Sequence, residues 1–249
     1  MTKPFETSLV MKRNDYKKGI LHGIPICLGY LAVSFSFGIF AVGQGLSIAE
    51  VVMISMTNVT SAGQLAGVPI IAGAGSLIEL ATTQFIINLR YALMSVSLSQ
   101  RMDKSVRQVD RFLIAFVNTD EVFAVSAVQP EGVSRFYMYG LITTPYLGWA
   151  IGTALGAIAG DVLPAIVSTA LGVAIYGMFI AIVVPDAKKH KPTALCVLLA
   201  VALSLLFYYI PGLSSVPSGF VIIICAVIAS AVFAFFAPID AEKKGGEEA

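Results

Sequence analysis

The amino-acid sequence predicts an all-α, polytopic helical membrane protein. Hydrophobic residues make up 57% of the 249-residue chain, charged residues only 12%, and the mean hydropathy is +0.85. Soluble domains carry roughly 25% charged residues. A bilayer core is spanned by about 20 apolar residues in a helix, and most apolar runs of this chain come close to that length.

Eight apolar runs follow one another, separated by short connections rich in Gly and Pro. They cover residues 19–42, 48–72, 77–99, 112–128, 136–160, 163–184, 193–210 and 218–237. No change of composition divides them, so we expect one helical membrane transport domain over residues 19–238. Residues 1–18 are expected to form a cytoplasmic N-terminal segment, and residues 239–249 a disordered cytoplasmic tail.

Positive charges concentrate in five regions. These are the N-terminal segment, the connection with Arg101, Lys104, Arg107 and Arg111, the single Arg135, the group Lys188, Lys189 and Lys191, and the pair Lys243 and Lys244. Because Lys and Arg are enriched in cytoplasmic connections, all five regions and both termini are predicted to be cytoplasmic. Eight simple crossings contradict this placement, since three crossings would carry residues 101–111 outside.

Two segments are therefore predicted to be re-entrant or broken. Run 112–128 is short for a crossing and has polar residues in its middle. Segment 50–73 is rich in hydroxyl side chains and glycines, and Pro69 removes a backbone donor. We predict six transmembrane crossings plus these two segments. The alternative is eight transmembrane helices with residues 101–111 outside.

Asp120 and Glu121 are adjacent carboxylates within an apolar run. A charge at membrane depth costs about 2.5–3.5 kcal/mol on insertion scales, so such groups persist where they face a cavity, a partner or water. We expect one of them, Asp120 before Glu121, to couple transport to protons, and Asn118 and Thr119 beside them to bind substrate. The alternative is that both acids lie near an interface and are solvated.

Arg90 lies near the middle of run 77–99. A buried guanidinium needs a partner, which is either a substrate carboxylate held by two hydrogen bonds or an acid of this chain. The acids are Glu79, Asp120 and Glu121, and the sequence leaves both interpretations open. The candidate substrate-binding residues of this run are Asn88, Arg90 and Tyr91.

Residues 57–64 form a polar stretch within segment 50–73. Polar groups at a helix break can bind the ammonium and carboxylate groups of a substrate, as half-helix ends do in transporters. The candidates here are Ser61, Gly63 and Gln64. The alternative is that these groups hold neighbouring helices together, at about 0.6 kcal/mol per contact.

Glycines recur at every fourth position of run 136–160. Gly148, Gly152, Gly156 and Gly160 give one helix face without side chains, which another helix can approach closely. This row predicts helix packing, most simply against a helix of the same chain.

Signatures of catalysis and of metal binding are absent from the sequence. The patterns HExxH, GxSxG and GxxxxGK[ST] do not occur. Cys27, Cys196, Cys225, His22 and His190 lie in apolar runs or at segment ends, without the spacing of a metal site. We expect neither an enzyme nor a bound cofactor or metal, and no nucleic-acid partner.

Several further motifs lie at residues 23–25, 29–38, 61–64, 90–91 and 119–124. Together they resemble the azaleucine-resistance (AzlC) family, the large subunits of branched-chain amino acid exporters. The family often has Asp where this chain has Asn88, and AGASQ where it has residues 60–64. The resemblance implies a plasma-membrane permease that works with a small hydrophobic AzlD-like subunit, with leucine, isoleucine and valine as substrates by analogy.

Three functions remain open at the level of sequence. The first is a secondary-active exporter of small, branched-chain amino acids, coupled to protons. The second is a channel-like pore in which the broken segments form a filter. The third is a non-transporting membrane scaffold subunit that uses the glycine row for docking.

Overall fold

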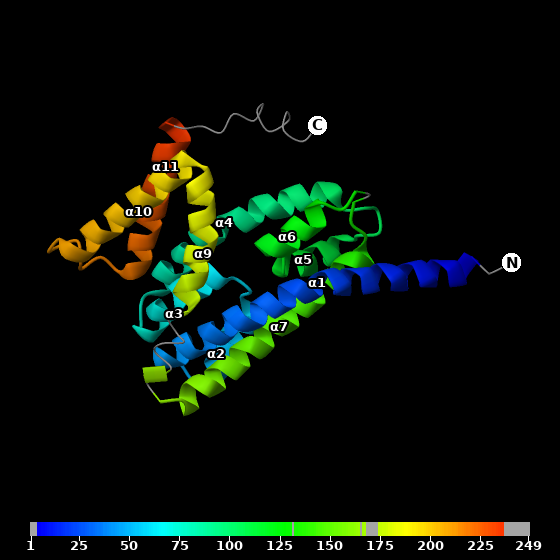
Figure 1. Cartoon of the computed structure of the whole chain (residues 1–249), viewed down its shortest axis with the longest axis horizontal. Helices are drawn as coiled ribbons and strands as arrows, with labels where there is room; N and C mark the ends of the chain where they lie inside the picture. The colour runs from blue at the N-terminus through cyan, green and yellow to red at the C-terminus, as the bar shows by residue number, and fades with distance from the viewer. Residues whose placement is uncertain (1–3, 131, 165, 168–173, 237–249) are drawn as a thin grey trace.

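The computed structural model describes residues 4–130, 132–164, 166–167 and 174–236. The helices are α1 (Pro4–Gly43), α2 (Ile48–Thr57), α3 (Ser61–Ala72), α4 (Leu77–Arg101), α5 (Gln108–Phe116), α6 (Asp120–Ala127), α7 (Arg135–Val162), α9 (Ala174–Lys189), α10 (Lys191–Tyr209) and α11 (Ser218–Phe236). Within these residues β-type pairing is limited to an isolated bridge between Met102 and Val133. The prediction of an all-α polytopic membrane protein is confirmed (Figure 1). The expected disordered tail lies outside the described residues.

Four of the described helices are long and apolar enough to cross a bilayer. They are the Arg13–Gly43 part of α1, and α7, α10 and α11. Helix α4 has 25 residues, a length of about 38 Å, but carries Glu79 and Arg90. Run 163–184 lies partly outside the described residues, so the number of six crossings stays a prediction.

Helices α1 and α7 run parallel in close contact along most of their length. A Cβ atom at Gly148 would lie 2.8 Å from the carbonyl oxygen of Cys27, and one at Gly152 would lie 2.6 Å from that of Leu31. Gly156 and Gly160 continue the row against the next turns of α1. The glycine row thus faces a helix of the same chain. It allows the backbones of α1 and α7 to approach each other closely.

Both segments expected to be broken are broken. Helices α2 and α3 are separated at residues 58–60, where Asn58 and Thr60 have extended backbone angles and the Thr60 hydroxyl accepts from Gly63 N. The break thus falls within the polar stretch 57–64, and Pro69 lies inside α3 without interrupting it. Side-chain oxygens that cap a new helix start, and not the missing proline donor, therefore end the first helix.

The second break, at residues 117–119, separates α5 from α6. Thr119 is the N-cap of α6, and its hydroxyl accepts from Val122 N. The segments that precede α5 and follow α6 are joined to each other, because Val133 N donates to Arg101 O at 3.0 Å. The end of α4 and the start of α7 therefore lie together, and α5 and α6 form a hairpin that enters and leaves at this same end.

We call this end, which holds Arg101, Arg107 and Arg135, the basic end. Helices α1 and α7 start there and α4 ends there. Helix α3 runs antiparallel to α4, because Gly63 lies against Gln84 and Gly67 against Leu80. The α2–α3 hairpin therefore enters from the opposite end, and the tips of the two hairpins approach each other in the middle (Figure 1).

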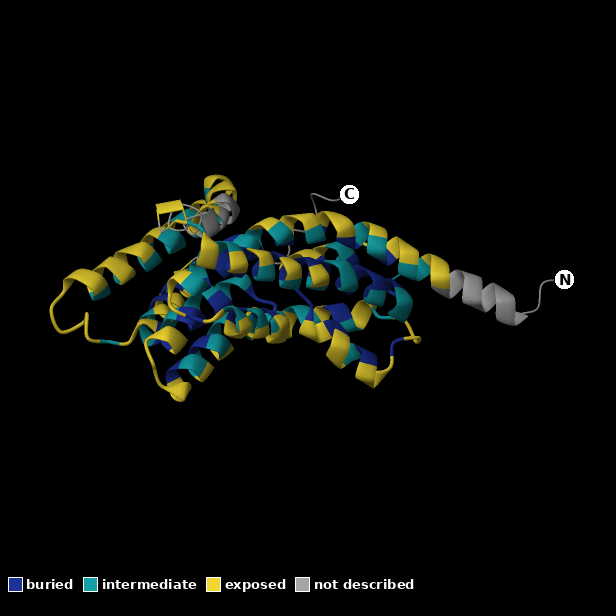
Figure 2. Ribbon diagram, turned by 90° about the horizontal axis from the view of Figure 1, so that it is seen from below, coloured by how far each residue is buried: buried dark blue, intermediate teal, exposed yellow. Residues whose placement is uncertain are grey.

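Burial is concentrated in this central region (Figure 2). One core cluster includes Tyr30, Val122, Leu141 and Trp149. By contrast, α10 buries none of its residues although it is strongly apolar. Exposed apolar faces of this kind suit a helix whose surroundings are lipid or another membrane subunit.

Candidate functional site

A cavity of about 750 Å³ lies where the tips of the two hairpins meet. Its walls come from α1, α4, α7, α9 and both helix breaks. The polar and aromatic lining residues are Tyr30, Ser61, Arg90, Tyr91, Thr119, Asp120, Glu121 and Trp149. We call this space the central cavity. It combines both charge signs with an apolar wall, which is the usual make-up of a site for a small polar ligand.

Arg90 and Asp120 form an ion pair across the central cavity. The Arg90 Nη1 atom lies 2.8 Å from Asp120 Oδ2, and about half of each side chain is exposed. Arg90 Nη2 also donates to the hydroxyl of Tyr91 at 3.2 Å. The sequence left open whether Arg90 pairs with an acid of this chain or binds a substrate carboxylate, and the structure contains the ion pair. Because about half of the Arg90 side chain is exposed, its guanidinium is also accessible to a ligand.

Glu121 has a different partner. The Tyr30 hydroxyl donates to Glu121 Oε2 at 2.5 Å, and the Tyr30 ring meets the Trp149 ring edge to face at 5.1 Å. Both acids lie in the first turn of α6, where the positive end of the helix dipole stabilises negative charge. Neighbouring carboxylates are thus held by two separate groups, a cation and a phenol.

Gln64 lies behind the wall of the central cavity. It is 1% exposed, accepts from Trp149 Nε1 at 3.1 Å and donates to Ser55 Oγ at 2.9 Å, and Ser55 continues the chain to Thr153 at 2.7 Å. Gly63 packs against Gln84. Of the three candidates in segment 50–73, the structure places Ser61 on the cavity, while Gln64 positions Trp149.

Asn88 and Asn118 line a neighbouring, smaller chamber instead of the central cavity. Asn88 Nδ2 donates to Gln84 O at 2.8 Å, and Asn118 Nδ2 donates to Ser95 Oγ at 3.1 Å. Tyr91 and Val59 line both spaces, so they form the wall between them.

Tyr30 and Trp149 are site residues that sequence reasoning missed. Trp149 is the single tryptophan of the chain and follows the first glycine of the row, which was a usable signal. The contact of Tyr30 with Glu121 spans 91 positions, and nothing in the local sequence indicates it.

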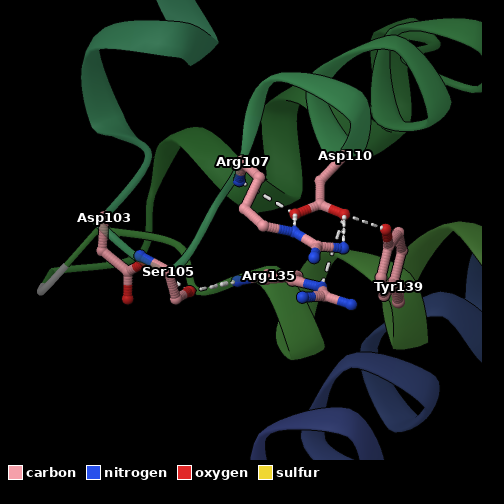
Figure 3. Close-up of polar contacts among 6 residues, drawn as sticks. All are labelled: Asp103, Ser105, Arg107, Asp110, Arg135 and Tyr139. Carbon is pink, nitrogen blue, oxygen red and sulfur yellow. Dashed lines mark hydrogen bonds and ion pairs between the residues drawn. The ribbon is translucent and has the colours of Figure 1, made fainter.

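A cluster of charges lies at the basic end, outside the central cavity (Figure 3). Asp110, only 1% exposed, accepts from Arg107 N at 2.8 Å and from the Tyr139 hydroxyl at 2.5 Å. Arg135 Nε lies 3.4 Å from Asp110 Oδ1, and Ser105 Oγ accepts from Arg135 N at 3.0 Å. Hydrogen bonds from Tyr139 and Arg107 hold the pKa of Asp110 well below its usual range. This cluster fastens the α5–α6 hairpin to the start of α7.

Comparisons with known proteins agree with this architecture. The family model described as AzlC protein matches residues 25–163, more than half of the chain. An "Uncharacterized membrane protein" of Archaeoglobus fulgidus is 30% identical over 181 residues, which are 72% of this chain and 79% of that protein. "Inner membrane protein YgaZ" of Escherichia coli K12 is 29% identical over 190 residues, 73% of this chain and 76% of that protein.

A membrane protein of Helicobacter pylori is 24% identical over 149 residues, which are 59% of this chain and 64% of that protein. No solved structure matches the chain. The family match, the relatives and the apolar helices agree on a membrane protein with a transport-related role. The chain belongs to the AzlC protein family.

Proposed function

We propose that this chain is a secondary-active exporter of small, branched-chain amino acids, coupled to protons. The observation that carries the proposal is the central cavity, where a half-exposed Arg90–Asp120 ion pair lies beside Glu121 and an apolar wall. An enzyme would need groups arranged for a reaction, and this cavity instead offers groups suited to binding a charged, partly apolar molecule. We therefore assign binding and release, and no chemical step.

The chemistry of the lining matches an amino acid zwitterion. A guanidinium binds a carboxylate through two hydrogen bonds, and Arg90 is accessible for this. Glu121 and Asp120 offer negative charge to the ammonium group. Ile26, Val33 and Val59 line the same cavity and suit a branched aliphatic side chain.

The ion pair also suggests how substrate and proton movements are linked. When a substrate carboxylate takes Arg90, Asp120 loses its counter-ion. An intramembrane carboxylate without a cation is the group in this site most suited to take up a proton. The ammonium group of the bound substrate competes with a proton for this carboxylate, so a proton that takes Asp120 displaces the substrate, which gives an exchange of one for the other.

The setting of the transporter is also part of the proposal. We propose a two-component permease in the plasma membrane, in which this chain pairs with a small hydrophobic AzlD-like subunit. The apolar surface of α10, which buries no residue in this chain, is available for such a subunit. The relative from Escherichia coli is named an inner membrane protein, which supports the membrane assigned. Positive charge at the basic end favours cytoplasmic termini.

Counterflow in proteoliposomes tests the proposal. Vesicles loaded with unlabelled leucine should accumulate external labelled leucine transiently above its equilibrium level, because an alternating-access carrier exchanges substrate. Vesicles loaded with an amino acid that is not transported provide the control. Labelled leucine that only equilibrates would indicate a channel-like pore. Absence of flux for a panel of amino acids, with protein that remains folded, would indicate a scaffold subunit.

A further inference from the structure

A second, polar chamber of about 250 Å³ adjoins the central cavity. Its lining includes five residues with a side-chain oxygen, Thr57, Asn58, Thr60, Asn88 and Asn118. Tyr91 and Val59 form the wall that it shares with the central cavity. We call this space the amide chamber. In contrast to the central cavity, its lining includes no carboxylate.

The two helix breaks give the two spaces opposite polarity. Helices α2 and α5 end at Thr57 and Phe116, and both ends line the amide chamber. Helices α3 and α6 begin at Ser61 and Asp120, and both starts line the central cavity. Because a helix end carries partial negative charge, the amide chamber is a favourable place for a cation.

Two of the residues that line the amide chamber carry a buried side-chain oxygen with no hydrogen-bond partner within the described residues. These oxygens are Asn88 Oδ1 and Asn118 Oδ1, and the Asn118 residue is 3% exposed. Asn88 Nδ2 donates to both Gln84 O and Gln84 Oε1, which fixes its other atom as the oxygen. Buried acceptors are normally satisfied, so these two oxygens point to a ligand that accepts lone pairs.

We propose that the amide chamber binds a monovalent alkali cation, with Asn88 and Asn118 as ligands. Hydroxyl groups of the two threonines that line the chamber extend this to an all-oxygen set, with water filling the remaining volume. The absence of a carboxylate from the lining favours a single positive charge over two. The adjacent Arg90 is neutralised by Asp120, so it does not oppose the ion. This site is distinct from the substrate cavity and does not depend on the proposed transport function.

Thermal unfolding of the purified full-length protein in detergent tests this site without any transport measurement. The unfolding midpoint is measured in sodium chloride, potassium chloride and choline chloride at equal ionic strength. A bound ion stabilises the folded state, so sodium or potassium should raise the midpoint saturably above the choline value. Asn118→Ala and Asn88→Ala should weaken the apparent ion affinity by about tenfold or more.

Two further variants keep the test decisive if the alanine variants do not fold. Asn88→Asp adds a negative charge beside the ion and should tighten sodium binding in a folded protein. Asn14→Ala changes an exposed residue of α1 outside the amide chamber and should leave the ion response unchanged. Equal midpoints in all three salts for the unmodified protein would overturn the proposal. A shift produced by leucine and not by alkali ions, and removed in Asn118→Ala, would also overturn it, because the chamber would then hold the substrate ammonium group.

Discussion

Asp120 and Glu121 are neighbours in the chain, yet the structure gives them unlike partners. Asp120 pairs with Arg90 at 2.8 Å, whereas Glu121 accepts from the uncharged Tyr30. A substrate carboxylate can take Arg90 away from Asp120, whereas the partner of Glu121 is a phenol that carries no charge for it to take. This difference assigns proton coupling to Asp120 and substrate binding to Glu121 within the proposed mechanism.

Substitution of each acid separates the two roles. Asp120→Asn should abolish leucine flux driven by a pH gradient and keep exchange of leucine for leucine, because exchange does not require net proton movement. Glu121→Gln should weaken both processes through a raised KM. Proteoliposomes with and without an imposed pH gradient measure the two processes. Full pH-driven flux in both variants would remove proton coupling from this site.

Arg90→Lys tests whether the guanidinium contacts substrate. A lysine keeps the charge but loses the two-pronged geometry, so we expect leucine affinity to fall by roughly 10–100-fold, the equivalent of a charged hydrogen bond of about 1.5–3 kcal/mol. Equilibrium binding of labelled leucine measures the change. Unchanged affinity together with lower thermal stability, restored by Asp120→Asn, would identify the ion pair as structural only.

At the scale of helices, the contact between α1 and α7 leaves no room for a side chain at the glycines between them. A Cβ at Gly156 would collide with the backbone of Phe35, which cannot move without separating the helices. Gly156→Ala should therefore lower the free energy of unfolding by about 1–3 kcal/mol, as overpacking of a core does. Thermal unfolding in detergent measures it.

Gly177→Ala is the matched control for that substitution. Gly177 lies inside α9, and a Cβ there would meet no atom within 4 Å in the described residues. This variant should be neutral or more stable by about 0.5–1 kcal/mol, because alanine is the better helix former. Equal effects of the two substitutions would contradict the close approach of α1 and α7.

The Asp110 cluster makes a second prediction at this scale. Its pKa is lowered by Tyr139 and Arg107, so the ionised carboxylate stabilises the folded state above its ordinary pKa of about 4, and this stabilisation is lost as the pH falls through the lowered value. Asp110→Asn should unfold at a lower temperature at pH 7. The difference from the unmodified protein should shrink below about pH 4. A difference that stays constant over this range would contradict an ionised Asp110.

The helices also show what the sequence could and could not predict. Polar residues in the middle of apolar runs located both breaks, since such residues cannot sit in a continuous lipid-facing helix. The first break falls within the polar stretch 57–64, as expected, and the capping hydroxyl of Thr60 marks the start of the second helix, whereas Pro69 does not interrupt it. The spacing of the glycine row pointed to a close helix contact, but the partner α1 follows only from the fold.

At the scale of the whole molecule, two hairpins that enter from opposite ends bring polar groups to one level. The α2–α3 tip supplies Ser61 and the α5–α6 tip supplies Asp120, and α4 carries Arg90 between them. These residues are 29 to 59 positions apart, so their meeting depends on the topology of the chain and not on any local pattern. The positions of Lys and Arg predicted this topology. Run 112–128 lies between two basic regions that are both expected in the cytoplasm, so it has to return to the side from which it enters.

The orientation in the membrane that the positive charges predict can be measured in intact cells. Lys104 lies at the basic end and Gln44 lies in the connection after α1, at the opposite end, and both residues are exposed. Lys104→Cys should resist an impermeant thiol reagent until cells are permeabilised, whereas Gln44→Cys should react from outside. The unmodified protein, with its three cysteines, sets the background. External labelling at both positions would support eight crossings, because only a crossing α2–α3 segment would put residues 44 and 104 on the same side. Protection of Gln44→Cys together with labelling of Lys104→Cys would agree with the two hairpins but indicate the opposite orientation in the membrane. The positive charges of the basic end would then lie outside, which contradicts the positive-inside rule.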